Sequence, residues 1–192
     1  MPRSFSQDEK ENIRKNLIFE CKKSWSAYGY KKTSIGELCA KVGISTGAFY
    51  AFYDSKEALF CDVMDDFQES TRLMYQQTLS SPPTKAQIIQ VLKNLYQEYA
   101  QNDIITKRHS ADYKNLLNKL PADWLKEHRA RSIKNLEASL LAPNTNLKVS
   151  IKRAHGIINT LLLTVANKDV IADHYEIFCT LLDCVVDEIY DL

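Results

Sequence analysis

Glycine, proline and long apolar runs are all scarce in this chain of 192 residues. The sequence contains 5 Gly and 5 Pro, too few for the many tight turns of an all-β protein. No apolar run reaches the roughly 18 residues that a membrane-spanning helix requires. The first residues, Met-Pro-Arg-Ser, lack the apolar core of a secretory signal. We therefore expect a soluble, cytoplasmic protein.

Patterns that carry catalytic or metal chemistry are also missing. The 5 cysteines form no Cys-x-x-Cys pair, and the 4 histidines have no paired spacing that suits zinc. The cysteines occupy apolar positions of helical patterns, so we interpret them as reduced core residues. No Ser-His-Asp or Cys-His signature, Gly-rich phosphate loop or His-Glu-x-x-His motif occurs. We expect no enzyme activity, no metal and no bound cofactor.

Helical periodicity and helix-start signals are abundant. Ser6 and Glu9 form a capping-box pattern, followed by an apolar stripe that ends at Gly29, a residue suited to a left-handed turn. The pattern Ser34-Ile35-Gly36-Glu37 opens a short helix through Lys41. Gly43 then suits a sharp turn, and Ser45 suits the cap of a third helix over 46–53. A helix, a glycine turn and a second short helix are typical of a helix-turn-helix.

The remainder of the chain also predicts helices alone. A fourth helix is expected at about 55–79, before the linker Ser80-Ser81-Pro82-Pro83. Thr84 caps a further helix, Pro121 interrupts a helical region over 110–141, and two helices are expected at about 146–167 and 173–190. The predicted fold is all-α, with an N-terminal three-helix helix-turn-helix domain (1–60) and a larger helical domain (61–192). Residues 1–60 carry 10 Lys/Arg and 7 Asp/Glu, a net charge of +3, in the direction expected of a nucleic-acid reader.

Residues 29–60 closely resemble the DNA-binding region of TetR-family transcriptional regulators. The resemblance is carried by four motifs: Gly29-Tyr30 followed by Thr33-Ser34, the turn Gly43-Ile44-Ser45, the helix Gly47-Ala48-Phe49-Tyr50, and Ser55-Lys56-Glu57 followed by Leu59-Phe60. It extends over about residues 6–65. Family membership implies a regulator, most commonly a repressor, that binds double-stranded DNA as a homodimer and responds to a small molecule.

The resemblance also implies roles for individual residues. Tyr50 matches a tyrosine that contacts a DNA phosphate, Lys56 matches a phosphate-contacting lysine, and Thr33 or Ser34 matches a phosphate-facing hydroxyl. Phe49 matches a buried anchor of the recognition helix. The positions expected at the groove are Ser45, Thr46, Gly47, Ala48 and Ala51. Because Gly36, Gly47, Ala48 and Ala51 lack hydrogen-bonding side chains, we expect phosphate contacts and DNA shape to carry much of the affinity. The alternatives to DNA contact are ordinary structural roles: packing for Tyr50, a solvated lysine for Lys56 and a helix cap for Thr33.

The second domain is expected to supply a dimer interface and a ligand pocket. Its last two helices are apolar on more than one side, so one side can face a second subunit; the alternative is that both sides are internal core. Aromatic residues that are candidates for the pocket, with ordinary core packing as the alternative for each, are Tyr96, Tyr99, Tyr113, Trp124 and Phe178. A helical scaffold or adaptor without sequence-specific DNA binding is the rival function.

Overall fold

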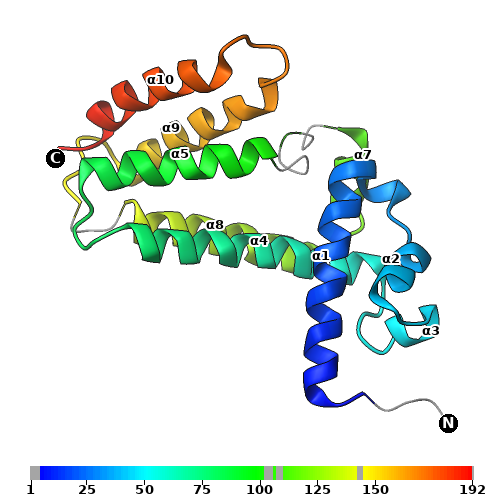
Figure 1. Ribbon diagram of the computed structural model, residues 1–192. Coiled ribbons are helices and arrows are strands. Elements are labelled where there is room, and N and C mark those ends of the chain that lie inside the picture. Colours follow the sequence, from blue (N-terminus) through cyan, green and yellow to red (C-terminus); the bar gives the residue numbers. More distant parts are fainter. Residues whose placement is uncertain (1–4, 102–105, 107–109, 142–144, 192) are drawn as a thin grey trace. The chain divides into compact units, whose positions relative to one another are not determined.

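The computed structural model is all-α, which confirms the predicted fold class. It describes residues 5–101, 106, 110–141 and 145–191. Among these residues there is no strand, only an isolated antiparallel bridge between Leu147 and Tyr190. In the described part of the chain, no helix combines the length and the hydropathy that crossing a bilayer requires. The helices are α1 (Gln7–Lys32), α2 (Ile35–Val42), α3 (Thr46–Phe49), α4 (Lys56–Thr78), α5 (Lys85–Gln101), α7 (Ala111–Leu117), α8 (Ala122–Ser139), α9 (Ile151–Leu163), η1 (Thr164–Asn167) and α10 (His174–Ile189) (Figure 1).

The chain divides into two compact units. The described residues of 1–67 and 109–121 form the first unit, and those of 68–108 and 122–192 form the second. Helix α4 contributes its first half to the first unit and its second half to the other. The first unit also contains α7, which is far from α1 to α4 in sequence. The sequence-predicted domains, 1–60 and 61–192, remain a prediction about domain boundaries.

Local signals explain the helix ends of the first unit. The Ser6 hydroxyl accepts from the Glu9 amide at 3.2 Å, and the Ser6 amide donates to the Glu9 carboxylate at 2.8 Å, so the predicted capping box is present. Gly29 has φ 82° and ψ 175°, a positive φ that favours glycine. The helix was predicted to end at Gly29, but α1 is only interrupted there and continues for one further turn to Lys32.

The turn between α2 and α3 follows the sequence prediction in part. Gly43 is left-handed, with φ 77° and ψ 30°, and Ser45 caps α3. Two expectations were wrong. Ser34 stands at the N-cap of α2 but its side chain makes no capping hydrogen bond. The third helix covers only Thr46–Phe49 rather than 46–53, because turns at Tyr50–Phe52 lead the chain directly toward α4.

The second unit packs α5, α9 and α10 against one another around a shared apolar core (Figure 1). Thr84 and Gln87 form the expected cap of α5, and the break at Pro121 separates α7 from α8. The helix predicted from 146 begins instead at Ile151, capped by Ser150. Residues before it pair with the chain end: the Lys148 amide donates to the Ile189 carbonyl at 2.8 Å, and the Asp191 amide donates to the Asn146 carbonyl at 2.7 Å.

Candidate nucleic-acid interface

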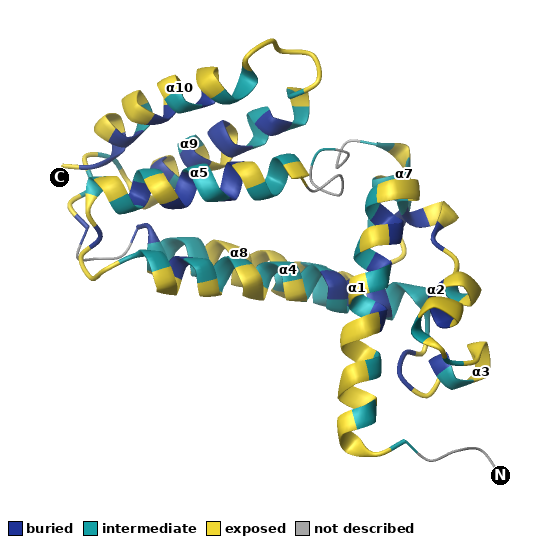
Figure 2. Cartoon of the chain, in the orientation of Figure 1, coloured by how far each residue is buried: buried dark blue, intermediate teal, exposed yellow. Residues whose placement is uncertain are grey.

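Helix α3 turns one side to solvent and buries the other. The side chains of Thr46, Tyr50 and Ala51, together with Gly47, are exposed, whereas Phe49 is fully buried. Ala48 is half-buried. Tyr50 is 54% exposed, and its ring meets that of Phe49 edge-on with centroids 5.4 Å apart. Most residues predicted to face the groove are therefore accessible, and Figure 2 colours part of α3 as exposed.

The residues of this surface offer few hydrogen bonds to bases. Gly47, Ala48 and Ala51 have no polar side-chain atom, and the Ser45 hydroxyl already accepts from the Ala48 amide at 3.1 Å. Thr46 is exposed and retains a hydroxyl that can reach a base edge or a phosphate. Gly36 on α2 is exposed as well and adds no side chain.

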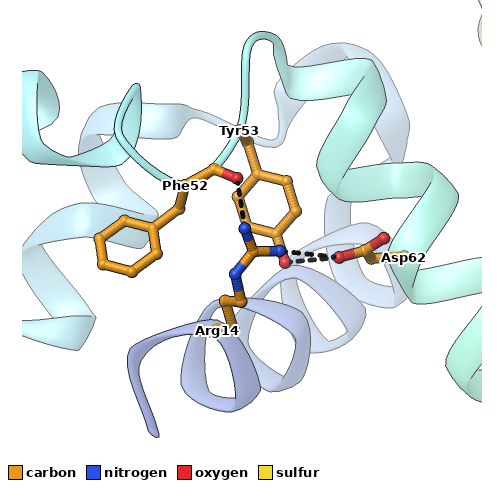
Figure 3. Close-up of polar contacts among 4 residues, drawn as sticks. All are labelled: Arg14, Phe52, Tyr53 and Asp62. Carbon is orange, nitrogen blue, oxygen red and sulfur yellow. Dashed lines mark hydrogen bonds and ion pairs between the residues drawn. The ribbon is translucent and has the colours of Figure 1, made fainter. Parts of the chain in front are cut away.

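An arginine on α1 supports the segment that follows α3 (Figure 3). The Arg14 guanidinium donates to the Phe52 carbonyl at 3.2 Å and lies 5.3 Å from the centre of the Tyr53 ring. It also lies 3.8 Å from the Asp62 carboxylate of α4, which accepts the Tyr53 hydroxyl at 2.9 Å. Burial and the neighbouring Asp62 together raise the pKa of Tyr53 well above its usual range, so the hydroxyl stays protonated and donating. These contacts join α1, the chain after α3, and α4.

The two hydroxyl residues before α2 are in different environments. Thr33 is 2% exposed, and its hydroxyl donates to the Gly29 carbonyl at 2.8 Å. This hydroxyl closes the last turn of α1, so Thr33 fills the capping role that was the alternative to a phosphate contact. Ser34 is exposed and makes no capping bond. Of the pair, Ser34 is the residue whose hydroxyl is accessible.

Lys56, at the start of α4, is tied to the end of α1. Its ammonium donates to the Tyr30 carbonyl at 2.7 Å and the Thr33 carbonyl at 3.0 Å, and it lies 4.2 Å from the centre of the Tyr30 ring. Burial lowers the pKa of Lys56, and the neighbouring Glu57 opposes that shift. Since an ammonium has three N–H donors, one donor remains beyond the two carbonyls. Lys56 is therefore more than a solvated lysine.

Three residues organise this unit through contacts that the sequence did not indicate. Arg14 bonds a residue 38 positions away, and the Asp112 carboxylate accepts from the Tyr30 and Lys31 amides, 82 and 81 positions away. Tyr30 donates its hydroxyl to Glu57 of α4. Local patterns cannot indicate contacts at such separations.

Comparison with known proteins identifies the region just described. Residues 22–63 match the sequence model of "Bacterial regulatory proteins, tetR family". This match runs from the second half of α1 into α4 and includes the whole α2–turn–α3 segment. Residues 22–63 of this chain are thus similar to the DNA-binding region of the tetR family.

Individual proteins are also similar to this chain. The chain is 23% identical over 99 residues to YdgC of Bacillus subtilis (strain 168), described as an uncharacterized HTH-type transcriptional regulator; the match covers 49% of this chain and 51% of YdgC. The chain thus aligns with only about half the length of that relative. A TetR-family regulator from Marinobacter aquaeolei VT8 shares the fold, with a TM-score of 0.68 and 14% identity over 97% of this chain and all of that one. RolR in complex with resorcinol gives a TM-score of 0.57 and 18% identity, covering 96% and 90% of the two chains.

The aromatic residues predicted for a TetR-type ligand pocket do not all lie in one unit. Tyr96 and Phe178 are buried in the second unit and stack with centroids 3.8 Å apart, and Tyr99 is half-buried against the same core. Trp124 of α8 stacks on His128 with centroids 4.7 Å apart. Tyr113 belongs instead to the first unit, where its ring stacks on Trp25 at 6.2 Å.

The buried Tyr96 hydroxyl has no hydrogen-bond partner among the described residues. Burial raises the pKa of Tyr96, and the nearby Thr164 hydroxyl, which donates to the Leu161 carbonyl at 2.7 Å, opposes that shift. The Tyr96 and Thr164 hydroxyls do not meet hydrogen-bond geometry, so the phenol is unsatisfied among the described residues.

The last two helices have apolar residues on both their inner and outer sides. Phe178, Leu182 and Val186 of α10 are buried in the core, whereas Ile177 and Leu181 of the same helix are each 45% exposed. On α9, Ile158 and Leu161 are buried, and Ile151 is 44% exposed. Figure 2 shows the exposed residues along the outer side of α10.

Proposed function

We propose that the chain is a TetR-family regulator: a cytoplasmic, ligand-responsive repressor that binds a near-palindromic operator as a homodimer. The observation that supports this most directly is an accessible surface, with Thr46 and Gly47 exposed on α3 and Tyr50 and Ala51 exposed directly after it, while Phe49 is buried and anchors the helix. A helix presented in this way suits the major groove, where base edges differ in their hydrogen-bonding patterns.

Phosphate contacts carry most of the affinity in this proposal. Tyr50 has an exposed hydroxyl-bearing ring, Ser34 has an accessible hydroxyl, and Lys56 keeps one N–H donor beyond its two carbonyl partners. These groups bind phosphate oxygens of the duplex backbone. Thr46 supplies the hydrogen-bonding contact to a base, and the methyl groups of Ala48 and Ala51 suit thymine methyls. Thr33 stabilises the end of α1.

Dimerisation through α9 and α10 would place two reading helices on one operator. The exposed apolar residues Ile151, Ile177 and Leu181 support this surface, because a helix that is apolar on two sides is stabilised by partners on both. A two-fold dimer binds two half-sites of opposite orientation.

A small-molecule effector is proposed to bind near Tyr96 in the second unit. An unsatisfied buried hydroxyl costs free energy, and a ligand with a hydrogen-bonding group beside an apolar or aromatic body would satisfy it. Tyr99 and Phe178 lie in the same core, whereas Tyr113, in the first unit, is set aside as a pocket residue. RolR, whose structure contains resorcinol, has a similar fold. No cofactor is proposed.

The test is selection of duplexes from a random pool by the full-length protein, followed by affinity measurements at two salt concentrations. We expect a selected sequence with two-fold symmetry and binding that weakens steeply with salt, because phosphate neutralisation releases counterions. Absence of binding at low salt would favour the helical adaptor. Metabolite turnover that is independent of DNA would favour an enzyme.

Two tyrosine substitutions, one at the proposed interface and one as its control, make this test more specific. Tyr50→Phe removes one hydroxyl from the proposed interface, and Tyr28→Phe removes one from α1, where Tyr28 is 62% exposed. Loss of a hydrogen bond to a charged phosphate is expected to weaken binding of all duplexes by about 10-fold or more, with Tyr28→Phe unchanged. A changed base preference at unaltered general affinity would contradict the role assigned to Tyr50.

A further inference from the structure

Two exposed residues of the proposed DNA-binding surface lie between two buried aromatic residues. Tyr50 and Ala51 are exposed, whereas Phe49 before them and Phe52 after them are buried. The Phe52 and Tyr53 amides both donate to the Phe49 carbonyl, at 2.8 and 3.0 Å. Because this turn is short, the positions of Tyr50 and Ala51 depend on how firmly its two ends are held.

The end of this turn at Phe52 is held from two places near the start of the chain. The Phe5 ring, just before α1, lies 5.9 Å from the Phe52 ring, centroid to centroid. The Arg14 guanidinium of α1 donates to the Phe52 carbonyl at 3.2 Å (Figure 3). A hydrogen bond from a charged donor is stronger than one from a neutral donor. We call the side chains of Phe5, Arg14, Tyr53 and Asp62 the Phe52 clamp.

The Arg14 guanidinium is itself fixed by two further contacts. It lies 5.3 Å from the centre of the Tyr53 ring and 3.8 Å from the Asp62 carboxylate of α4. Asp62 in turn accepts the Tyr53 hydroxyl at 2.9 Å (Figure 3). A planar guanidinium can face a ring, pair with a carboxylate and donate to a carbonyl at once, which a lysine ammonium does less well. Since the Arg14 side chain is 49% exposed, these contacts, rather than burial, determine where it lies.

We propose that Arg14 is a positioning residue for DNA binding: by holding the Phe52 carbonyl, it fixes the direction in which Tyr50 and Ala51 face the duplex. Without Arg14, the end of the turn at Phe52 is held mainly by apolar packing, which is not directional. The proposal rests on the proposed DNA-binding function and adds a residue that acts from outside the recognition surface. Arg14 also precedes residues 22–63, which match the family model.

A direct contact between Arg14 and a DNA phosphate is the role that must be distinguished from positioning. The two roles differ in salt dependence, because each neutralised phosphate contributes about 0.9 to the slope of log K against log salt. Lys15→Ala is the matched control. Lys15 is the next residue on α1, is exposed and carries the same charge as Arg14, so its loss reproduces the general electrostatic effect without touching the Phe52 clamp.

The experiment measures affinity for the selected duplex in full-length wild type, Arg14→Ala, Arg14→Lys and Lys15→Ala, each with and without Tyr50→Phe. Conditions are chosen so that urea unfolding shows every variant to be folded. We expect Arg14→Ala to weaken binding about 10-fold more than Lys15→Ala, as for loss of a charge-assisted hydrogen bond, with the same salt slope. In Arg14→Ala, Tyr50→Phe should cost about 3-fold or less instead of about 10-fold, because a misplaced phenol contributes little. Arg14→Lys keeps the charge and a donor, so its affinity should lie between those of wild type and Arg14→Ala.

Amide exchange in the free protein, resolved by NMR, tests the Phe52 clamp without DNA. In Arg14→Ala we expect exchange at the Phe52 and Tyr53 amides to accelerate by about 10-fold, because the turn opens more readily once its carbonyl end is released. Lys15→Ala should exchange at the wild-type rate. Equal exchange rates in Arg14→Ala and Lys15→Ala would overturn the proposal.

Two results of the binding measurements would also overturn it. One is an equal cost of Tyr50→Phe with and without Arg14, and the other is a salt slope for Arg14→Ala that is shallower than that of Lys15→Ala by about 0.9. If Arg14→Ala does not fold, Arg14→Lys takes its place in the same comparison, and an equal cost of Tyr50→Phe is again decisive. Failure of wild type to bind any duplex would instead be the failure of the proposed function, and amide exchange would still test the clamp.

Discussion

Substitution of Gly29 by alanine tests the junction between α1 and α7. Gly29 has φ 82° and ψ 175°, a conformation that L residues rarely adopt. A Cβ built on Gly29 would lie 2.5 Å from the Asp112 carboxylate oxygen and 3.3 Å from its carbon. Gly29→Ala therefore introduces backbone strain and displaces the carboxylate from the amides that it accepts.

The two effects have separable magnitudes. The backbone conformation alone is expected to cost about 1–3 kcal/mol in an L residue. Displacing Asp112 weakens charge-assisted hydrogen bonds to two amides, an expected loss of about 1.5–3 kcal/mol. We expect Gly29→Ala to lower the free energy of unfolding of the first unit by about 2.5–6 kcal/mol. In an Asp112→Ala background only the strain remains, so the cost should fall to about 1–3 kcal/mol.

Urea unfolding of the full-length chain measures this cycle. Trp25 is buried in the first unit beside Phe60, with ring centroids 4.6 Å apart, whereas Trp124 lies in the second unit. A Trp124→Phe background leaves Trp25 as the fluorescent reporter of the first unit. The matched control is Gly36→Ala: Gly36 is helical, and its Cβ would meet only the Ser34 hydroxyl, at 3.8 Å. There alanine should stabilise the protein by about 0.5–1 kcal/mol.

Two results would refute this reasoning. A cost below about 1 kcal/mol for Gly29→Ala would mean that the residue does not require its positive φ. An equal cost with and without the Asp112 side chain would mean that the carboxylate does not lie against Gly29.

Two further predictions concern the second unit and the buried thiols. Leu181→Asp, on the outer side of α10, should raise the Kd of the proposed homodimer by on the order of 100-fold, because it buries an unpaired carboxylate from each subunit. Sedimentation should then show monomers. The control Ile133→Asp, on α8 and 41% exposed, should leave dimers. A thiol reagent gives a second readout, since exposed Cys184 should react slowly in the wild-type dimer and rapidly in Leu181→Asp. Burial raises the pKa of Cys21 to about 12, so Cys21 should react only on unfolding. Because the folded-state pKa is raised, this thiol's contribution to stability is intact below pH 9.0, its ordinary value, and is lost as pH rises toward about 12; reaction of Cys21 in the folded protein, or constant stability over that range, would contradict its burial.

The parts of the fold that sequence predicted well depend on neighbouring residues. The Ser6–Glu9 capping box, the left-handed Gly43 and the cap by Ser45 each involve residues at most four apart, so the local sequence contains nearly all of the interactions that determine them. Ser34 was misjudged because its pattern fits a cap equally well, while in the structure neighbouring Thr33 closes the end of α1. Sequence cannot decide which of two adjacent hydroxyls turns inward.

Tertiary contacts determine what the sequence could not. The α7 segment was predicted to be helical, but nothing in its pattern indicates that it packs on α1 rather than in the second unit. Tyr113 was assigned to the pocket for this reason: its aromatic ring suits either core equally well, and only the fold brings it to Trp25. Tyr96 and Phe178, in contrast, stack on each other in the core of the second unit; their role in a ligand pocket stays a prediction.

Because α3 is so short, the conformation of the DNA-recognition segment depends on the residues that surround it. A helix of four residues is far too short to be stable alone, because the conformational entropy lost in forming the first turn exceeds the free energy gained from its hydrogen bond. Its geometry must come from the burial of Phe49, the Ser45 cap and the bond from Arg14 to the Phe52 carbonyl. With few polar side chains to read bases, affinity for DNA then depends on how accurately the frame positions Tyr50 and Lys56. A substitution that displaces these contacts, such as loss of the bond from Arg14, is therefore expected to weaken DNA binding without changing any residue of the recognition surface.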